Sequence, residues 1–337
     1  MLTRILLLTI LLSSLLTSAA NSYAQTAKRK VCIYDVAGRH GEIYNHMREF
    51  QITALTWGVD LELKVYTDEK IAAEDFKAEQ CDAVTLTGLR SRAFNNFTGS
   101  ISAFGAIPSY EHLKLVMQAV SNPKLAPRMI NGRYEISGVI PIGAAYLFVN
   151  DRNVDTPAEI SGKRIAVMDY DKSQASIATY LGASPVSVDV TTFAGKFNNG
   201  SVDICGAPAE AYGVLELYKG LEPNGGIISS PILQVTLQMV TYNDKFPADF
   251  GQKSREFFYA FYEQRLNQIT KITNTIDAKW WVDIPKDKLV EYNEIARQGR
   301  VRLRNDGIYD AAMLTLLKRV RCKLDATLSE CADNLEG

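Results

Sequence analysis

The sequence predicts an α/β fold of two lobes, in which two extended strands cross a hinge and a helical segment follows at the C-terminal end. Three observations predict it. Short apolar runs rich in β-branched residues alternate with helical patterns, two longer extended stretches flank the middle block, and helical patterns dominate after residue 246. Strand–helix–strand order favours a mainly parallel sheet with helices on its faces. The chain of 337 residues is long enough for two such units.

The first alternating part of the chain ends near residue 120. Strands are predicted at 31–36, 61–66 and 83–86, and helices at 40–55, 71–79 and 110–120. The helix over 40–55 depends on the spacing of Ile43, Met47 and Phe50, which places these three apolar side chains on one helical face.

The two extended stretches organise the rest of the chain. They cover 134–150 and 227–242 and flank strands at 164–168, 186–190 and 202–205 and a helix at 173–181; helices at 250–268, 286–297 and 309–323 follow. Two crossings between the lobes make a hinge. We expect lobe I to comprise 25–146 and 234–337, and lobe II to comprise 147–233. The ligand site is expected in the cleft between them, with closure as the motion.

The first 24 residues have the layout of a secretory signal peptide. Arg4 precedes an apolar run over 5–16, and Ser22 and Ala24 are the small residues that a signal peptidase reads. The run is shorter than the ~20 helical residues that span a bilayer. The sequence therefore predicts export to the periplasm and removal of residues 1–24.

The cysteines fit an oxidising compartment. Cys322 and Cys331 are close in sequence and would join the tail to the last helix. Cys32 and Cys81 lie in or beside two predicted neighbouring strands and form a second possible pair. Cys205 would then have no disulfide partner. The sequence has no Cys-x-x-Cys and no paired histidines. We therefore expect neither a metal site nor another cofactor.

The overall charge is balanced, with a net charge of −1 at pH 7. This argues against nucleic acid or an anionic membrane as the main partner. Basic residues nevertheless gather near the C-terminal end, at Arg297, Arg300, Arg302, Arg304, Lys318, Arg319, Arg321 and Lys323. They are expected to form a solvated surface that favours the last helix, or else a docking patch for a membrane partner.

Five segments between residues 80 and 245 match one family in order and spacing. They are Cys81–Val84, Ile107–His112, Thr156–Ile165, Leu181–Val186 and Phe193–Asp203. Together they resemble the substrate-binding proteins of tripartite ATP-independent periplasmic (TRAP) transporters. The resemblance implies a periplasmic-binding-protein-like fold and a monomer that delivers a small solute to an inner-membrane permease driven by an ion gradient.

The sequence departs from the family at one position. TRAP proteins that bind organic acids carry an arginine on the first strand of the second lobe, where this chain has Ala166. Arg164 would lie on the same face but about 7 Å further along the strand. Since a bidentate arginine–carboxylate bond is sensitive to placement, anionic, cationic and hydroxylated ligands all stay open.

In the first lobe, candidate ligand-binding residues follow the strand ends. In open α/β lobes, ligands contact the loops at the carboxyl ends of strands. Arg39 follows the strand over 31–36, and Thr87 and Arg90 follow the strand over 83–86. Tyr146 lies on the first crossing stretch. The alternatives are a solvated helix face for Arg90 and core packing for Tyr146.

The second lobe supplies an acidic set of candidates. Asp169, Tyr170 and Asp171 follow the strand over 164–168, and Glu210 and Tyr212 follow the strand over 202–205. Asp171 is also in place to cap the next helix. Carboxylates and phenols at these strand ends suit a cationic or hydroxylated ligand better than an anion.

The sequence does not indicate catalysis. It lacks the Gly-x-Ser-x-Gly, His-Glu-x-x-His and phosphate-loop motifs, and its three histidines are scattered. We predict a periplasmic solute-binding protein and no enzyme. The alternative is an accessory periplasmic protein of an envelope transport or efflux assembly that has kept this fold but lost solute binding.

Overall fold

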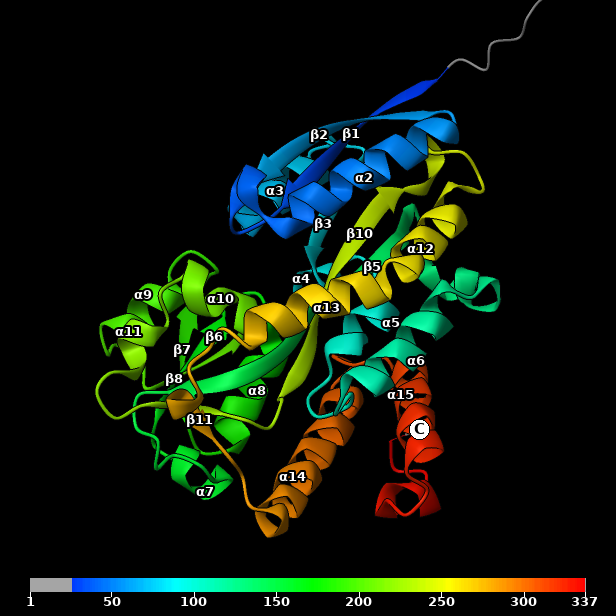
Figure 1. Cartoon of the computed structure of the whole chain (residues 1–337). Helices are drawn as coiled ribbons and strands as arrows, with labels where there is room; N and C mark the ends of the chain where they lie inside the picture. The colour runs from blue at the N-terminus through cyan, green and yellow to red at the C-terminus, as the bar shows by residue number, and fades with distance from the viewer. Residues whose placement is uncertain (1–25, 337) are drawn as a thin grey trace, which may run out of the picture.

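The computed structural model describes residues 26–336, and the predicted signal peptide lies outside the described residues. The strands are β1 (Ala27–Tyr34), β2 (Val59–Tyr66), β3 (Ala83–Thr87), β4 (Ile130–Asn131), β5 (Tyr134–Val149), β6 (Arg164–Met168), β7 (Ser184–Val188), β8 (Ile204–Pro208), β9 (Gly226–Ile228), β10 (Leu233–Tyr242) and β11 (Trp281–Val282). In Figure 1 the first lobe surrounds β1, β2 and β3, and the second lobe surrounds β6, β7 and β8.

The helices cover both lobes and continue to the C-terminal end. They are α2 (Glu42–Thr56), α3 (Glu69–Lys77), α4 (Gly88–Ser91), α5 (Asn96–Gly99), α6 (Tyr110–Ser121), α7 (Pro157–Ile160), α8 (Lys172–Tyr180), α9 (Phe193–Asn198), α10 (Ala209–Val214), α11 (Tyr218–Leu221), α12 (Phe250–Ala260), α13 (Tyr262–Thr273), α14 (Lys286–Asn305) and α15 (Ala311–Leu324). The helix expected over 250–268 is therefore two helices that meet at Phe261, and the helix expected over 286–297 continues to Asn305.

One sheet runs through both lobes in the order β2-β1-β3-β10-β5-β8-β6-β7. The strands are parallel within each lobe, whereas β10 and β5 pair antiparallel with each other and with their neighbours. The sheet is therefore mixed rather than mainly parallel, because the chain must reverse direction each time it passes between the lobes.

Strand β5 is shared by the two lobes. Its first part, from Tyr134 to Ala145, pairs with β10, and its last part, from Ala145 to Val149, pairs with β8. The register against β10 shifts beside Pro141 and Gly143, and Gly143 has a φ of 123°. Proline removes a backbone donor and glycine accepts this backbone angle, so these two residues allow the strand to bend as it leaves the first lobe.

Helix α14 contacts both lobes. The Tyr292 hydroxyl donates to the backbone oxygen of Asp155 at 2.9 Å, and Gln298 accepts from the Tyr180 hydroxyl at 2.7 Å, so the helix is held against the second lobe. Arg300 on the same helix donates to the backbone oxygen of Phe104 in the first lobe at 2.8 Å. Helix α13 likewise runs from the centre of the molecule to the second lobe in Figure 1.

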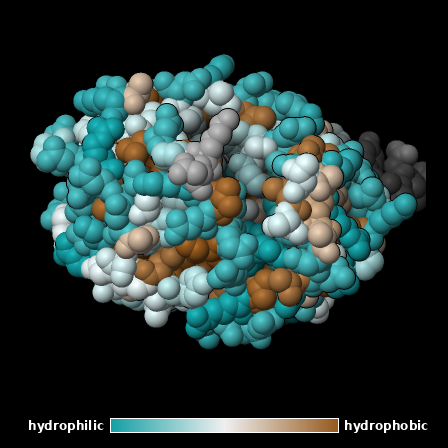
Figure 2. All heavy atoms as spheres, turned by 90° about the horizontal axis from the view of Figure 1, so that it is seen from below, coloured by the Kyte–Doolittle hydropathy of each residue, from teal (hydrophilic) through white to brown (hydrophobic). Residues whose placement is uncertain are grey.

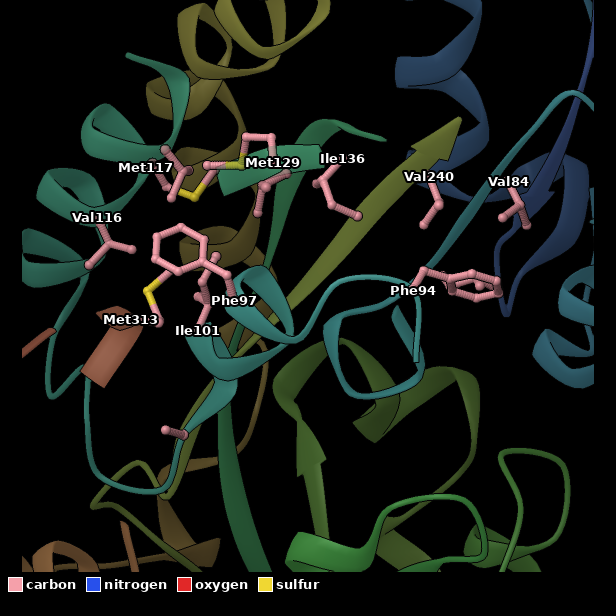
Figure 3. Close-up of a cluster of buried hydrophobic side chains, with 14 of the residues drawn as sticks. Val84, Phe94, Phe97, Ile101, Val116, Met117, Met129, Ile136, Val240 and Met313 are labelled. Atoms are coloured by element: carbon pink, nitrogen blue, oxygen red, sulfur yellow. The ribbon is translucent and has the colours of Figure 1, made fainter. Parts of the chain in front are cut away.

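The largest buried cluster lies in the first lobe beneath α6 and α15. Figure 3 shows Phe97 of α5 among Val116 and Met117 of α6 and Met313 of α15. All four side chains are buried. The cluster joins residues far apart in sequence, so the C-terminal helix is part of the first-lobe core.

Both expected disulfides are confirmed. Cys32 of β1 is bonded to Cys81 just before β3, with 5.9 Å between the Cα atoms. Cys322 of α15 is bonded to Cys331, with 5.7 Å between the Cα atoms. Cys205 is free and buried in β8.

Three of the basic C-terminal residues, Arg300, Lys318 and Arg321, are buried and not on a solvated surface, contrary to expectation. Arg300 and Arg321 are 3% and 2% exposed, and both form ion pairs with the buried carboxylates of Glu330 and Glu336. Burial lowers the pKa of Arg300, and the neighbouring Arg321 charge lowers it further. A buried charge requires a partner, and the Cys322–Cys331 disulfide holds the tail that supplies these two carboxylates.

The surface is predominantly polar on the face seen in Figure 2, where apolar side chains form small separate patches. Large exposed apolar side chains such as Ile52, Ile71 and Val290 come from three different helices. Isolated apolar residues of this kind are normal on soluble surfaces. Within residues 26–336, no helix combines the length and the hydropathy needed to cross a bilayer.

Candidate functional site

A cavity of about 540 Å³ lies between the two lobes. Its walls come from the strand ends of the first lobe, from β5 and β10, from β6, β8, α8 and α10 of the second lobe, and from α13 and α14. Cavities of ~300–1,000 Å³ hold small organic ligands. The position between the lobes agrees with the cleft expected from the sequence.

The cavity wall is mostly apolar and carries an unbalanced set of charged groups. Three carboxylates line it, those of Asp35, Glu42 and Glu210, together with His40. No lysine or arginine is among the described residues that line it. The carboxylates give the wall a negative charge; Asp35 is buried, so its charge is screened poorly, whereas Glu42 is exposed.

Asp35 is fixed at the start of α2. Its carboxylate accepts hydrogen bonds from the backbone N–H groups of Ala37 at 2.9 Å and Tyr44 at 3.0 Å. Gly41 leaves room for it, because a Cβ at that residue would lie 1.9 Å from Asp35 Oδ1. Burial raises the pKa of Asp35, and the backbone hydrogen bonds oppose that rise.

Glu210 projects from the first turn of α10 and forms an ion pair with Arg265 of α13. Arg265 also donates to the backbone oxygen of Pro141 at 2.9 Å. Burial raises the pKa of Glu210, Arg265 lowers it, and the charges of Asp35 and Glu42 raise it again. Of the three carboxylates at this end of the cavity, Glu210 is the one that is paired with Arg265 among the described residues.

Two arginines of the first lobe reach across to the second lobe. The Arg90 guanidinium lies 3.7 Å from the centre of the Tyr170 ring and is 3.1 Å from a carboxylate oxygen of Glu69, to which the Tyr170 hydroxyl donates. Arg92 donates to the carboxylate of Asp171 at 2.7 Å. These contacts connect the lobes at the ends of β3 and β6.

The structure brings part of the sequence-predicted set to the cavity. Thr87, Tyr170, Glu210 and Tyr212 line it. The other five predicted residues, which are not among its lining residues, are Arg39, Arg90, Tyr146, Asp169 and Asp171.

These five residues have other surroundings. Arg39 and Asp169 are exposed. Arg90 pairs with Glu69, as described above. Tyr146 packs edge-on against Trp281 with 5.0 Å between the ring centres. Asp171 accepts from the backbone N–H of Ser173 at 3.0 Å and so caps α8, which is the second role that the sequence left open.

Other lining residues were not in the predicted set. Tyr34, Asp35, His40 and Glu42 surround the end of β1 and the start of α2. The strand-end rule points to Asp35 once the end of β1 is known, because the strand stops at Tyr34 and not at residue 36 as predicted. Arg265 sits in the middle of a helix far along the chain, and no local pattern connects it with Glu210.

Ala166, the residue at which the sequence resemblance places the family arginine, lines the cavity. Arg164 does not line it. It forms a two-pronged ion pair with Asp203, through Nε at 3.0 Å and Nη2 at 2.6 Å, on the surface of the second lobe. Among the described residues, no arginine of β6 therefore lines the cavity.

The fold is similar to crystal structures of TRAP periplasmic solute-binding proteins. One from Ralstonia eutropha H16 with bound (S)-2-acetolactate has a TM-score of 0.72 and 12% identity, and covers 88% of this chain and 99% of that one. Another, from Desulfovibrio salexigens with bound orotic acid, has a TM-score of 0.69 and 12% identity over the same shares. At this identity the likeness concerns the fold, and the predicted two-lobed architecture is confirmed.

Two relatives from Acinetobacter baumannii are closer in sequence. The probable solute-binding protein AdeT1 is 41% identical over 304 residues, which are 90% of this chain and all of the relative. The probable solute-binding protein AdeT2 is 30% identical over 235 residues, 69% of this chain and 98% of that protein. The model of the family "Solute-binding protein AdeT 1/2" matches residues 51–336. The chain therefore belongs to the AdeT 1/2 family of solute-binding proteins and has the fold of the TRAP solute-binding proteins.

Proposed function

We propose that this protein captures a small solute in the cavity between its lobes and delivers it to an inner-membrane permease. The observation that carries the proposal is the cavity of about 540 Å³ with walls from both lobes. A solute in such a cavity contacts both lobes at once, so its binding energy favours the closed arrangement over the open one.

The proposal includes the residue boundaries and the location expected from the sequence. Residues 1–24 direct export and are removed, and the mature protein works as a periplasmic monomer without catalytic activity. Lobe I comprises 25–146 and 234–337, and lobe II comprises 147–233. The pairing of β5 with both β10 and β8 supports a hinge near residue 145.

Closure depends on the contacts that connect the lobes outside the cavity. Two contacts link the lobes, Arg90 with Tyr170 and Arg92 with Asp171. Neither arginine is among the described residues that line the cavity. After the solute has been released, these two contacts would hold the lobes in their unliganded arrangement. A permease that separates Arg92 from Asp171 would therefore open the cavity and lower its affinity.

Solution scattering on the mature chain tests the proposal. A panel of organic acids, amino acids, sugars and amines is screened first by thermal unfolding, in which a solute at ~100 times its Kd adds about 2.7 kcal/mol. The radius of gyration is then measured with and without each solute that stabilises the protein. We expect at least one solute to raise the unfolding temperature and reduce the radius of gyration.

The accessory-protein alternative has one observation in its favour, the alanine at position 166 in place of the family arginine. It predicts that no solute in the panel changes either quantity and that the protein is captured with an envelope assembly. That combination of results would replace the proposal.

A further inference from the structure

We infer that the captured solute is an organic cation, a monovalent ammonium group attached to an apolar body. The inference depends on the proposed function, since it names the class of solute for the same cavity. It is carried by the charges that line the cavity, by the engagement of the nearby arginines, and by the hydroxyl of one buried tyrosine that has no partner among the described residues.

Two arginines that contact lining residues, Arg265 beside Glu210 and Arg90 beside Tyr170, are already engaged by protein groups. Arg265 donates to Pro141 O and Gln268 and pairs with Glu210. Arg90 is sandwiched between Glu69 and the ring of Tyr170. An anionic solute would have to displace these partners.

Arg92 is engaged in the same way, by Asp171 and by the backbone oxygen of Gly99 at 3.2 Å. At Ala166, the residue at which the sequence resemblance places the family arginine, the cavity wall has only a methyl group. A buried carboxylate that loses its arginine is left with an uncompensated charge, so these pairs disfavour an anionic solute.

The acidic end of the cavity has more negative than positive groups, and a bound cation would balance them. Asp35, Glu42 and Glu210 line the cavity, and Arg265 is the only basic side chain paired with any of them among the described residues. Among the described residues, Glu42 accepts a hydrogen bond only from the neutral amide of Gln268, at 3.2 Å. A bound ammonium group would relieve the repulsion among the three carboxylates.

The hydroxyl of a buried tyrosine provides a second and independent indication of a ligand. Tyr34 is 7% exposed and lines the cavity at the end of β1, next to Asp35. Within residues 26–336 its hydroxyl makes no hydrogen bond; the only bond of Tyr34 to a side chain is from its backbone N–H to Thr85. A phenol in the cavity wall without a protein partner is available to a solute.

The other side chains of the wall indicate that the uncharged part of the solute is apolar. Aromatic side chains line the cavity at Tyr34, Phe104, Tyr170, Phe193, Tyr212 and Tyr292. Aromatic faces attract ammonium groups, and aliphatic walls favour an apolar body. A polyhydroxylated solute would leave many of its hydroxyls unpaired against this wall, which disfavours its binding.

A metal ion is a poorer occupant than an organic cation. No group of three or more histidine, cysteine, aspartate or glutamate side chains is arranged to hold a metal in the part of the chain that the structure describes. Hard divalent cations require several oxygen ligands at once, and Asp35 and Glu210 already have protein partners.

The test compares three probes of nearly the same shape by isothermal titration calorimetry on the mature chain. Benzyltrimethylammonium is the cation, neopentylbenzene is its neutral isostere, and phenylacetate is the anion; succinate serves as a small dicarboxylate. We expect benzyltrimethylammonium to bind at least about tenfold more tightly than the other three, because a single charge contact in a medium of intermediate dielectric exceeds that difference.

Matched variants locate the charge contact. Glu42→Gln and Glu210→Gln should each weaken benzyltrimethylammonium by about tenfold or more. Glu62→Gln removes one negative charge from an exposed position on β2, outside the cavity lining, and should leave the affinity unchanged. Glu42 is exposed and makes no ion pair among the described residues, so its substitution tests the charge even if Glu210→Gln disturbs Arg265.

Each failure has a distinct meaning. Binding of phenylacetate or succinate without binding of benzyltrimethylammonium overturns the cationic solute and leaves the proposed function standing. Binding of benzyltrimethylammonium that neither acidic variant weakens overturns the assignment of the site. If none of the four probes binds, the cationic solute is rejected, and if the wider panel also fails to bind or to compact the protein, the proposed function is rejected with it.

Discussion

Asp171→Asn tests whether the contact between Arg92 and Asp171 holds the lobes together. The Arg92 Nη1–Asp171 Oδ1 distance is 2.7 Å, and the two side chains are 12% and 0% exposed. Asparagine caps helices about as well as aspartate, so the bond from the Ser173 N–H is retained and mainly the charged contact is lost. A hydrogen bond to a charged partner contributes about 1.5–3 kcal/mol, which is the expected loss of unfolding free energy.

The same loss has a second consequence because the contact joins the two lobes. If the lost contact favours the closed over the open arrangement by about 2 kcal/mol, the ratio of closed to open molecules falls roughly thirtyfold in the variant. The unliganded variant should then have a larger radius of gyration than the parent protein in solution scattering. Urea unfolding measures the first quantity, and scattering measures the second.

Asp169→Asn is the matched control. It removes the same charge two residues away, from an exposed side chain that forms no ion pair among the described residues. We expect its unfolding free energy to stay within about 0.5 kcal/mol of the parent protein. If Asp171→Asn were indistinguishable from this control in both measurements, the reasoning about the lobe contact would be refuted.

Three further predictions concern other parts of the molecule. Burial beside Phe258 and Phe261 lowers the pKa of His46 to about 4. The unfolding free energy should therefore be fully present above pH 6.5 and fall as the pH drops toward 4. When urea unfolding is repeated across that pH range, the fall should be smaller in His46→Phe. Glu336→Gln should lower the unfolding free energy by about 3–5 kcal/mol, because it leaves two buried guanidinium groups short of a partner; a loss below 1 kcal/mol would contradict this. Ala166→Arg should weaken benzyltrimethylammonium by at least about tenfold in calorimetry, and an unchanged affinity would mean that this residue does not face the solute.

Much of the fold could be predicted because its causes are local. Strand β6 occupies the predicted residues 164–168, and α2 covers the run in which Ile43, Met47 and Phe50 share a face. Apolar periodicity depends only on near neighbours in the chain, so it identifies elements well. The disulfides were predictable for a related reason, since Cys32 and Cys81 lie in or beside elements that the βαβ order makes neighbours.

The candidate site could be predicted only in part. Position at the end of a strand correctly indicated Thr87, Tyr170, Glu210 and Tyr212 as cavity residues. It did not separate Asp171, which caps α8, from a ligand-binding carboxylate, because both roles require a polar residue at the same place. Local sequence also gave no indication that the helix expected over 250–268 breaks at Phe261.

The sequence by itself determined the class of protein: the order of strands and helices, the two crossings and the cysteine pairs. Tertiary structure alone decided which charges meet. Glu210 and Arg265 are 55 residues apart, and Arg300 and Glu336 are 36 apart, yet each pair is in contact. Electrostatic interaction depends on distance in space and on burial, and neither is encoded in local periodicity. The sequence therefore predicts that the basic C-terminal residues form a surface, whereas in the fold Arg300 and Arg321 belong to a buried network of ion pairs.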